Sequence, residues 1–259
     1  MTEWTRRALV ASPTAPAQAA ARSLADACDW VSVDDADLII ALGGDGFMLQ
    51  TLHTMLDRRR PMVPVFGMNL GTVGFLMNEW RPHGLSERLA RAKSIKVTPL
   101  QVTITGMDGR VHQIPAINEV SLLRETRQTA KLEVTVNDRV VLPELACDGI
   151  LVATPAGSTA YNLSAHGPIL PLGAGLLALT PISPFRPRRW RGAILPDKAR
   201  ISLRVLNPAK RPVSAVADQH EVRDVASVDV CIDRARELTL VFDPEHALDD
   251  RITMEQFIA

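Results

Sequence analysis

Four residues, Gly43, Gly44, Asp45 and Gly46, follow directly on an apolar run, and their types suit phosphate chemistry. Glycines after a buried strand allow positive φ and close backbone approach, and the N–H groups at the start of a following helix can bind an anion. A carboxylate at the centre of the turn suggests action on a hydroxyl group. The pattern predicts phosphate held by backbone and a proton accepted by Asp45. The alternative is a purely structural turn, because capping alone favours Asp at a helix start.

A second group of small and polar residues runs from Cys147 to Pro168. Within it, residues 150–153 form an apolar run that predicts a buried strand, and a loop follows. Small residues in such a loop let a flat ring or a phosphodiester lie against the backbone, while Thr and Ser hydroxyls donate or accept hydrogen bonds. Tyr161 is the chain's single tyrosine, and it can stack or bond as well as pack in a core.

Alternating strands and helices are expected to position the first group. The patterns predict strands at 7–11, 31–33, 37–42 and 62–68, and helices at 17–27, 47–57 and 83–92. This alternation indicates parallel βαβ units in a Rossmann-like α/β domain. A second glycine-bearing turn follows at 67–76. Ligands of open α/β sheets bind beyond the carboxyl ends of the strands, so both glycine turns should face one crevice.

The pattern changes near residues 94–98 to alternating β-rich segments, which predict strands at 102–105, 132–136, 201–205, 213–216, 228–232 and 238–242. Hairpin turns are expected at 107–109 and 137–138. The expected domains are therefore 1–95, of α/β type, and 96–244, β-rich. A closing helix in 245–259 could pack back on the first domain.

Composition restricts the classes of partner. The 259 residues include 29 Lys and Arg and 29 Asp and Glu, so no overall field attracts nucleic acid or an anionic membrane. No run of about 18 apolar residues predicts a membrane span. Cys28, Cys147 and Cys231 are odd in number and widely spaced, which favours reduced thiols in a cytoplasmic protein over disulfides or a zinc site.

Four segments, taken in order, resemble the NAD kinases: Gly43–Gly46, Gly67–Leu76, Ala116–Val120, and Asp148–Gly149 with Thr154–Tyr161. The last segment is highly specific, whereas GGDG turns also occur in lipid kinases and resemble those of phosphofructokinases. The resemblance implies an α/β domain, a β-rich domain, and transfer of the ATP γ-phosphoryl group to the adenosine 2′-hydroxyl of NAD. Polyphosphate is the alternative donor. It also implies assembly as a homodimer or homotetramer.

The resemblance assigns roles to individual residues of this chain. Asp45 matches the aspartate near the acceptor hydroxyl, and its place near a helix start should keep it ionised. Nucleotide-binding positions of the family match Gly43, Gly44, Gly46, Phe75 (against adenine), Asn118, Glu119, Asp148, Thr159, Ala160, Tyr161, Ser164 and Asp218. Mg²⁺ or another divalent cation is expected to arrive with ATP, and the sequence assigns no metal ligands.

The chain departs from the family pattern at several positions. Ala156 replaces a Thr or Ser, Phe47 replaces a frequent Thr, and Thr72-Val73 replaces a frequent Arg-Leu. His220 follows the late DGQ-like segment where glycine is usual, and His166 also stands where glycine is frequent. These changes concern contacts to the phosphate donor more than contacts to the acceptor.

A basic run at 186–191 stays outside the predicted site. It could supply cations to a phosphate, meet a neighbouring subunit, or form a solvated loop.

Two other functions fit part of the pattern. A lipid kinase would share the GGDG turn but needs an apolar acceptor cleft, which the small polar loop at 154–164 does not favour. A catalytically silent NAD-binding regulator would use the same residues without the proton acceptor, yet Asp45 is present.

Overall fold

The computed structural model describes residues 4–56, 62–71, 74–244 and 248–257. The chain forms two compact units, one of residues 1–97 with 236–254 and one of 98–235 with 255–259. The change of unit after Val97 lies close to the expected boundary at residue 95. None of the helices within the described ranges is long and apolar enough to cross a membrane.

The first unit is a largely parallel sheet with helices. Its strands are β1 (Arg7–Ala11), β2 (Leu38–Gly43), β3 (Val65–Asn69), β4 (Asn78–Glu79), β5 (Lys93–Val97) and β18 (Leu238–Phe242). Its helices are α1 (Ala15–Ser23), α2 (Asp45–Leu56) and α3 (Leu85–Arg91), and α5 (Leu248–Glu255) follows near the end of the chain. The strand order is β1-β2-β3-β18-β5, and β4 pairs with β3.

Strand β2 is buried along its whole length because both faces of the sheet are covered. Leu38, Ile40 and Leu42 pack with residues of α1 and α3 in one hydrophobic cluster. Ile39 and Ala41 alternate with them and are also fully buried. The continuous apolar run that predicted this strand therefore reflects burial on two sides, and it places the strand's last residue, Gly43, at the edge of the sheet.

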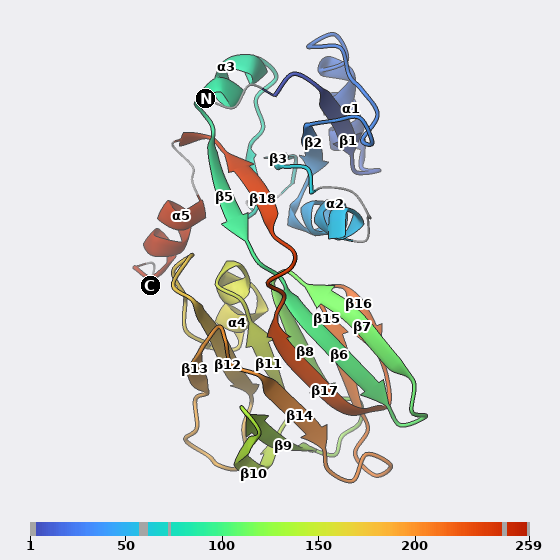
Figure 1. Ribbon diagram of the computed structural model, residues 1–259, viewed down its shortest axis with the longest axis vertical. Coiled ribbons are helices and arrows are strands. Elements are labelled where there is room, and N and C mark those ends of the chain that lie inside the picture. Colours follow the sequence, from blue (N-terminus) through green and yellow to red (C-terminus); the bar gives the residue numbers. More distant parts are fainter. Residues whose placement is uncertain (1–3, 57–61, 72–73, 245–247, 258–259) are drawn as a thin grey trace. The chain divides into compact units, whose positions relative to one another are not determined.

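Strand β18 corrects the sequence-based domain assignment. Residues 238–242 were expected in the β-rich domain, but β18 pairs in parallel with β3 and antiparallel with β5 of the first sheet. Figure 1 shows β5 and β18 side by side although they lie far apart in the sequence. Its residues 238 and 240–242 are buried, and an apolar strand of this kind fits the interior of an α/β sheet.

Two local predictions in the first unit are also wrong. Residues 31–33 form no strand, because the segment makes a single bridge between Arg7 and Trp30 instead of a ladder. Helix α1 spans Ala15–Ser23 and not 17–27. The Trp30 indole N–H donates to the carbonyls of Leu24 and Ala25, just after the helix end, which favours the turn that leaves the helix. The remaining expected elements of this unit are found, with ends shifted by a few residues.

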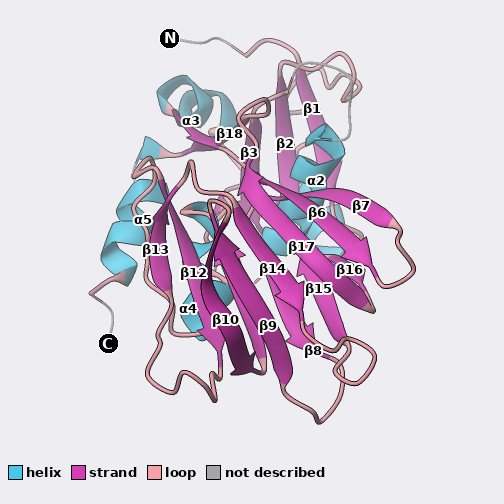
Figure 2. Ribbon diagram, turned by 60° about the horizontal axis from the view of Figure 1, so that its bottom comes forward, coloured by secondary structure: helices cyan, strands magenta, loops and turns pink. Residues whose placement is uncertain are grey.

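The second unit consists almost entirely of strands, drawn in magenta in Figure 2. One sheet has the order β10-β9-β14-β17-β6-β7, and the other has the order β13-β12-β11-β8-β15-β16. The first sheet contains β6 (Leu100–Gly106), β7 (Val111–Ala116), β9 (Ala130–Val136), β10 (Arg139–Cys147), β14 (Ile201–Val205) and β17 (Val225–Ile232). The second contains β8 (Glu119–Arg124), β11 (Gly149–Ala153), β12 (Leu176–Ile182), β13 (Ala193–Pro196), β15 (Val213–Ala217) and β16 (His220–Val222).

The two sheets of this unit share one core. Alternate residues of both sheets, such as Val102 and Leu203 from one and Leu122 and Ile150 from the other, belong to a single buried cluster. The sheets therefore pack face to face as a β-sandwich. The hairpin turns expected at 107–109 and 137–138 join β6 to β7 and β9 to β10, and Asn137 and Asp138 both have positive φ.

Strand β11 carries the second functional segment and is buried on both faces. Ile150 and Val152 point into the sandwich core, whereas Leu151 and Ala153 join a second cluster on the opposite face of the sheet. Tyr161 packs against that second cluster. The segment after β11 thus folds back over its own strand, as the 3-10 helix η1 (Ala156–Thr159) and the short helix α4 (Tyr161–Ser164).

Candidate functional site

The GGDG segment forms the predicted junction between a strand and a helix. Gly43 ends β2, and Asp45 begins α2. The Gly44 carbonyl accepts hydrogen bonds from the N–H groups of Phe47 and Met48, both at 3.0 Å. Neither Gly43 nor Gly44 has positive φ. Close approach explains Gly43, because a Cβ there would lie 2.8 Å from the Phe47 Cβ.

The Asp45 carboxylate is oriented by backbone groups from the second glycine turn. Oδ2 accepts the Phe75 N–H at 2.7 Å, and Oδ1 accepts the Leu76 N–H at 3.1 Å. The structure thus brings Asp45 and Phe75 together, as expected for two turns at one sheet edge. Thr72 and Val73 lie outside the described residues.

Gly74 leaves space for the Asp45 carboxylate. A Cβ at position 74 would collide with the carboxylate oxygens, which belong to a side chain held by two backbone bonds. We expect Gly74→Ala to displace this carboxylate and lower the turnover number more than tenfold, with little change in stability. Gly71→Ala is the control, since among the described residues the nearest atom to a Cβ there is Asn69 Oδ1, at 3.8 Å. Equal turnover in both variants, measured with saturating substrates, would contradict this role of Gly74.

Asp218 holds the turn that carries Asn118 and Glu119. Its Oδ2 accepts the Ile117 N–H at 2.6 Å, and its Oδ1 accepts the N–H groups of Asn118 and Glu119 at 2.9 and 3.3 Å. Its own N–H donates to the Glu119 carbonyl at 3.1 Å. Asp218 has a φ of 50°, a conformation that Asp tolerates better than most residues. Through these contacts Asp218 positions both residues.

Removing the Asp218 carboxylate should disturb both stability and substrate binding. In Asp218→Ala, three partly buried N–H groups lose their acceptor, which costs on the order of 1–3 kcal/mol. We expect a lower melting temperature and a higher KM for the nucleotide that Asn118 and Glu119 bind. Asp224→Ala is the control, because Asp224 also has positive φ, 52°, but its carboxylate makes no hydrogen bond or ion pair in the described part of the chain. If both variants lose melting temperature and substrate affinity to a similar extent, the effect of Asp218→Ala comes from backbone strain and not from the lost carboxylate.

The segment after β11 is fastened to the same turn. The Thr154 hydroxyl donates to the Ile117 carbonyl at 2.7 Å and accepts the Gly157 N–H at 3.1 Å. The Thr154 N–H donates to the Asn118 carbonyl at 2.9 Å. Gly157 passes so close to Asn118 that any Cβ would collide with its backbone. The two predicted segments of the second unit are therefore joined by hydrogen bonds and close packing.

The predicted residues of this segment occupy different depths. Thr159 is buried in η1, and Ala160 is half-buried where η1 meets α4. Tyr161 is half-buried, and Ser164 is exposed at the end of α4. Ala156, where the family has a hydroxyl, is 5% exposed, so its methyl group is a packing group here.

Burial and neighbouring carboxylates shift the pKa values of Glu119 and Tyr161. Burial, and secondly the negative charge of Asp218, raise the pKa of Glu119 to about 7, while a hydrogen bond from the Tyr161 backbone opposes this shift. Burial followed by the charges of Glu119 and Asp148 raises the pKa of Tyr161. Asp148 itself is paired with Arg124, whose Nε lies 2.5 Å from Oδ1.

Two acceptor atoms of this site have no partner among the described residues. Asn118 Oδ1 and Glu119 Oε2 are buried and make no hydrogen bond within that part of the chain. Buried polar atoms are nearly always satisfied, and an orphaned one carries a substantial free-energy cost. Both atoms accept hydrogen bonds, so a ligand bound here should present donors such as hydroxyl or amino groups.

A buried hydrogen-bond network around Asn162, which the sequence analysis missed, fixes α4. The Asn162 amide donates to the carbonyls of Ser158 and Pro168, and its Oδ1 accepts the Thr180 hydroxyl at 2.7 Å. Gly167 packs so closely on Asn162 that a Cβ there would collide with it. Asn162 directly follows Tyr161, the last residue of the family segment, and that adjacency was the available signal. Arg124, the partner of Asp148, carried no comparable sequence signal.

No metal centre is found among the described residues, where no three His, Cys, Asp or Glu side chains could hold an ion together. Cys28, Cys147 and Cys231 are free thiols, as predicted.

The chain matches two family models, the ATP-NAD kinase N-terminal domain over residues 11–92 and the ATP-NAD kinase C-terminal domain over residues 117–249. It is 69% identical to the NAD kinase of Rhizorhabdus wittichii over 252 residues, which covers 97% of this chain and 98% of that protein. It is 63% identical to the NAD kinase of Zymomonas mobilis over 255 residues, or 98% of each chain.

Two solved structures share the fold at low sequence identity. Yeast NADH kinase complexed with NADH superposes with a TM-score of 0.81 at 21% identity, covering 99% of this chain and 88% of that one. The NAD kinase of Archaeoglobus fulgidus in complex with ATP gives a TM-score of 0.74 at 21% identity, covering 98% of this chain and 100% of that one. Both family models and the close relatives confirm the sequence-based resemblance, and the chain belongs to the ATP-NAD kinase family of enzymes.

Proposed function

We propose that this chain phosphorylates NAD with ATP, placing the γ-phosphoryl group on the 2′-hydroxyl of the adenosine ribose to give NADP and ADP. Family membership and the relatives named NAD kinase, at 69% and 63% identity, support the reaction. The single structural observation that carries it is the pair of buried acceptor atoms, Asn118 Oδ1 and Glu119 Oε2, which have no partner among the residues that the structure describes. Ribose hydroxyls supply the donors that these atoms lack.

Asp45 is proposed to orient the 2′-hydroxyl and to take its proton. The ribose oxygen forms a bond to the γ-phosphorus, the bond from that phosphorus to the ADP oxygen breaks, and the proton passes to the carboxylate. Phosphoryl transfer needs little covalent work from the protein, so placement of the hydroxyl is the main requirement. The bonds from the Phe75 and Leu76 N–H groups support this role, because they fix the carboxylate before substrate binds.

The remaining predicted residues have binding roles in this proposal. Gly43, Gly44 and Gly46 lie beside the helix start and present backbone to the phosphates, and Phe75 stacks on adenine. Asp148, Thr159, Ala160, Tyr161 and Ser164 line the path of the dinucleotide. Asp218 positions Asn118 and Glu119, because its carboxylate accepts three N–H groups of their turn.

Mg²⁺ or another divalent cation is proposed to enter with ATP, where it would neutralise charge on the phosphate oxygens. The enzyme is proposed to act in the cytoplasm as a homodimer or homotetramer. Light scattering of the purified chain would test the oligomeric state. A monomer at assay concentrations would contradict the oligomer.

Acceptor choice tests the proposed function against its rivals. The purified chain, with Mg²⁺ and ATP, is supplied with either NAD or diacylglycerol, and ADP release and NADP are measured. We expect both products with NAD and neither with the lipid. Phosphorylated lipid would support a lipid kinase, and tight NAD binding without NADP would support the regulator. Replacing ATP by polyphosphate in the NAD reaction identifies the donor.

A further inference from the structure

A large hollow in the second unit is lined by the basic run at 186–191, which the proposed function leaves unused. Its volume is about 890 Å³, and its lining includes Arg188, Arg189, Arg191, Trp190 and His166. Ligand pockets usually measure about 300–1,000 Å³. The hollow therefore has room for a ligand much larger than a single phosphate ion.

The charge in this hollow is uniformly positive. Three guanidinium groups line it, and no Asp or Glu is among the described residues of its wall. Arg188, Arg189 and Arg191 are exposed, and their side chains make no hydrogen bond or ion pair to any described residue. A concave surface lined by one sign of charge concentrates counter-ions. Because the whole chain has a net charge of zero, this is a local concentration of charge.

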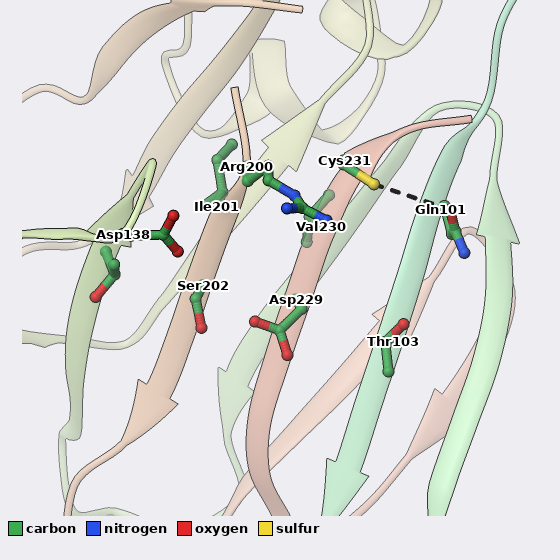
Figure 3. A pocket seen from close by; sticks show the side chains of 10 residues that line it. Gln101, Thr103, Asp138, Arg200, Ile201, Ser202, Asp229, Val230 and Cys231 are labelled. Atoms are coloured by element: carbon green, nitrogen blue, oxygen red, sulfur yellow. Dashed lines mark hydrogen bonds between the residues drawn. The ribbon is translucent and has the colours of Figure 1, made fainter. Parts of the chain in front are cut away.

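A smaller hollow on the same unit provides a contrast. Figure 3 shows it over β14, β17 and β6, where Arg200 lies among lining residues that include Asp138 and Asp229. Its volume is about 290 Å³, and the two carboxylates outnumber the one guanidinium. A hollow of this composition offers no net attraction to an anion. The larger hollow differs because its three arginines have no carboxylate beside them in the lining.

The backbone of the basic loop is fixed without help from its arginine side chains. Ala146 and Arg186 exchange two backbone hydrogen bonds, at 2.9 and 3.1 Å, where the loop begins. Trp190, which is half-buried, packs against the sandwich core. Gly192, at the other end, has a φ of 104° and lies so close to Leu179 that a Cβ would collide with its carbonyl. The backbone of the loop is therefore held at both ends, and the guanidinium groups remain available to a ligand.

The rest of the lining consists of polar and small groups. His166 and Ser183 both have positive φ, 61° and 46°, and line the hollow with Ala165 and Pro184. His166 follows α4 closely, but none of the residues assigned to NAD lines this hollow. The hollow therefore lies next to the residues assigned to NAD and does not include them.

We propose that this arginine pocket, defined by Arg188, Arg189, Arg191, Trp190 and His166, binds an anion with two or more linked phosphate groups, separately from the reacting NAD. Guanidinium groups bind phosphate oxygens in pairs, and three of them match a chain of phosphates better than one phosphate ion. Such a chain occurs both in inorganic oligophosphate and in nucleotides. In a nucleotide the base would have the Trp190 ring beside it.

The test is to measure the binding of inorganic tripolyphosphate to the full chain by calorimetry. The variant Arg188→Gln/Arg189→Gln/Arg191→Gln should lose a binding step that the wild type shows, or bind at least tenfold more weakly. The control is Arg127→Gln/Arg139→Gln/Arg200→Gln, which removes the same charge from three exposed arginines of the same unit that do not share a hollow. The control should bind as the wild type does. Parallel titrations with ADP show whether a base adds to the affinity.

Several results would overturn the proposal. They are absence of tripolyphosphate binding to the wild type, equal binding by the first triple variant, or an equal loss in the control. A rise in KM for NAD that parallels the loss of binding would instead assign the arginines to the acceptor site, which also overturns a separate pocket. If the triple variant has a lowered melting temperature, the single variant Arg189→Gln replaces it, with at least a threefold weaker affinity expected. NADP formation is measured alongside, so failure of this site and failure of the kinase reaction give different results.

Discussion

Replacing Asp45 by Asn is expected to lower the turnover number for NADP formation by about 10²- to 10⁴-fold, the range typical of a lost general base. The amide keeps the size of the side chain but cannot take up the proton of the 2′-hydroxyl. It also loses one of the two acceptors for the Phe75 and Leu76 N–H groups, which should reduce stability by about 1 kcal/mol. The dissociation constant for NAD should stay nearly unchanged. Rapid-quench measurement of product and calorimetric binding of NAD separate the two quantities.

Asp37→Asn is a matched control for this variant. Asp37 lies in the same unit, and its carboxylate also accepts backbone N–H groups, from Thr5 and Arg6 at 3.1 Å. The chemical change and the lost backbone bond are therefore the same, whereas no role in the reaction is proposed for Asp37. We expect its turnover number to match the wild type. An active Asp45→Asn variant, or an equally impaired Asp37→Asn variant, would remove Asp45 from its proposed role.

Glu119 gives the second large effect, and Glu119→Gln should weaken NAD binding by about 10- to 100-fold, the equivalent of a lost hydrogen bond to a charged group. The unpartnered Oε2 is expected to accept a hydroxyl of the ligand, and the variant can place an N–H₂ there instead. Glu144→Gln is the control, because Glu144 is an exposed residue paired with Lys131. Unchanged NAD affinity in Glu119→Gln would show that Oε2 does not contact the nucleotide.

The raised pKa of Glu119, about 7, predicts a pH dependence with a definite sign. The carboxyl group becomes protonated as the pH falls through 7, so wild-type NAD affinity should decrease below that pH. Glu119→Gln has no such group and should lack this decrease. The test is to measure the dissociation constant for NAD between pH 5.5 and 8.5, at pH values about half a unit apart. A wild-type affinity independent of pH over this range would contradict it.

The same shift makes an opposite prediction for stability. Because the folded-state pKa of Glu119 lies above the unfolded value of 4.5, ionisation destabilises the fold as the pH rises from 4.5 through 7. At pH 8 the free wild-type enzyme should therefore melt below Glu119→Gln, and the two should converge near pH 5. Bound NAD should narrow this difference in melting temperature, because it supplies a hydrogen-bond donor to the Glu119 carboxylate. A Glu119→Gln variant that melts below the wild type at pH 8 would contradict this account.

Local patterns predicted the parts of the site that depend on neighbours in the sequence. The apolar run before Gly43 required a buried strand, and the glycine turn required a helix after it, so both were found. Residues 150–153 were recognised as a strand for the same reason, although their sequence did not show that both faces are covered. The family segments identified Asn118, Glu119 and Tyr161, which the structure groups in one unit.

Contacts between distant residues could not be predicted from these patterns. The Asp45 carboxylate meets the N–H groups of Phe75 and Leu76 only through the fold, and Asp218 reaches the turn at 117–119 from the far end of the second unit's sequence. Strand β18 was placed in the wrong domain because an apolar strand carries no information about which sheet it joins. The arginine pocket likewise depends on a loop conformation that composition alone does not specify.

The position and origin of the transferred phosphate test the central proposal most directly. The purified chain is incubated with NAD, Mg²⁺ and ATP labelled in its γ-phosphoryl group, and the dinucleotide product is examined by mass spectrometry and phosphorus NMR. We expect the labelled phosphate on the adenosine 2′-oxygen, formed in equal amount with ADP. A labelled phosphate elsewhere, or no NADP above a control without enzyme while NAD still binds, would contradict the proposed reaction.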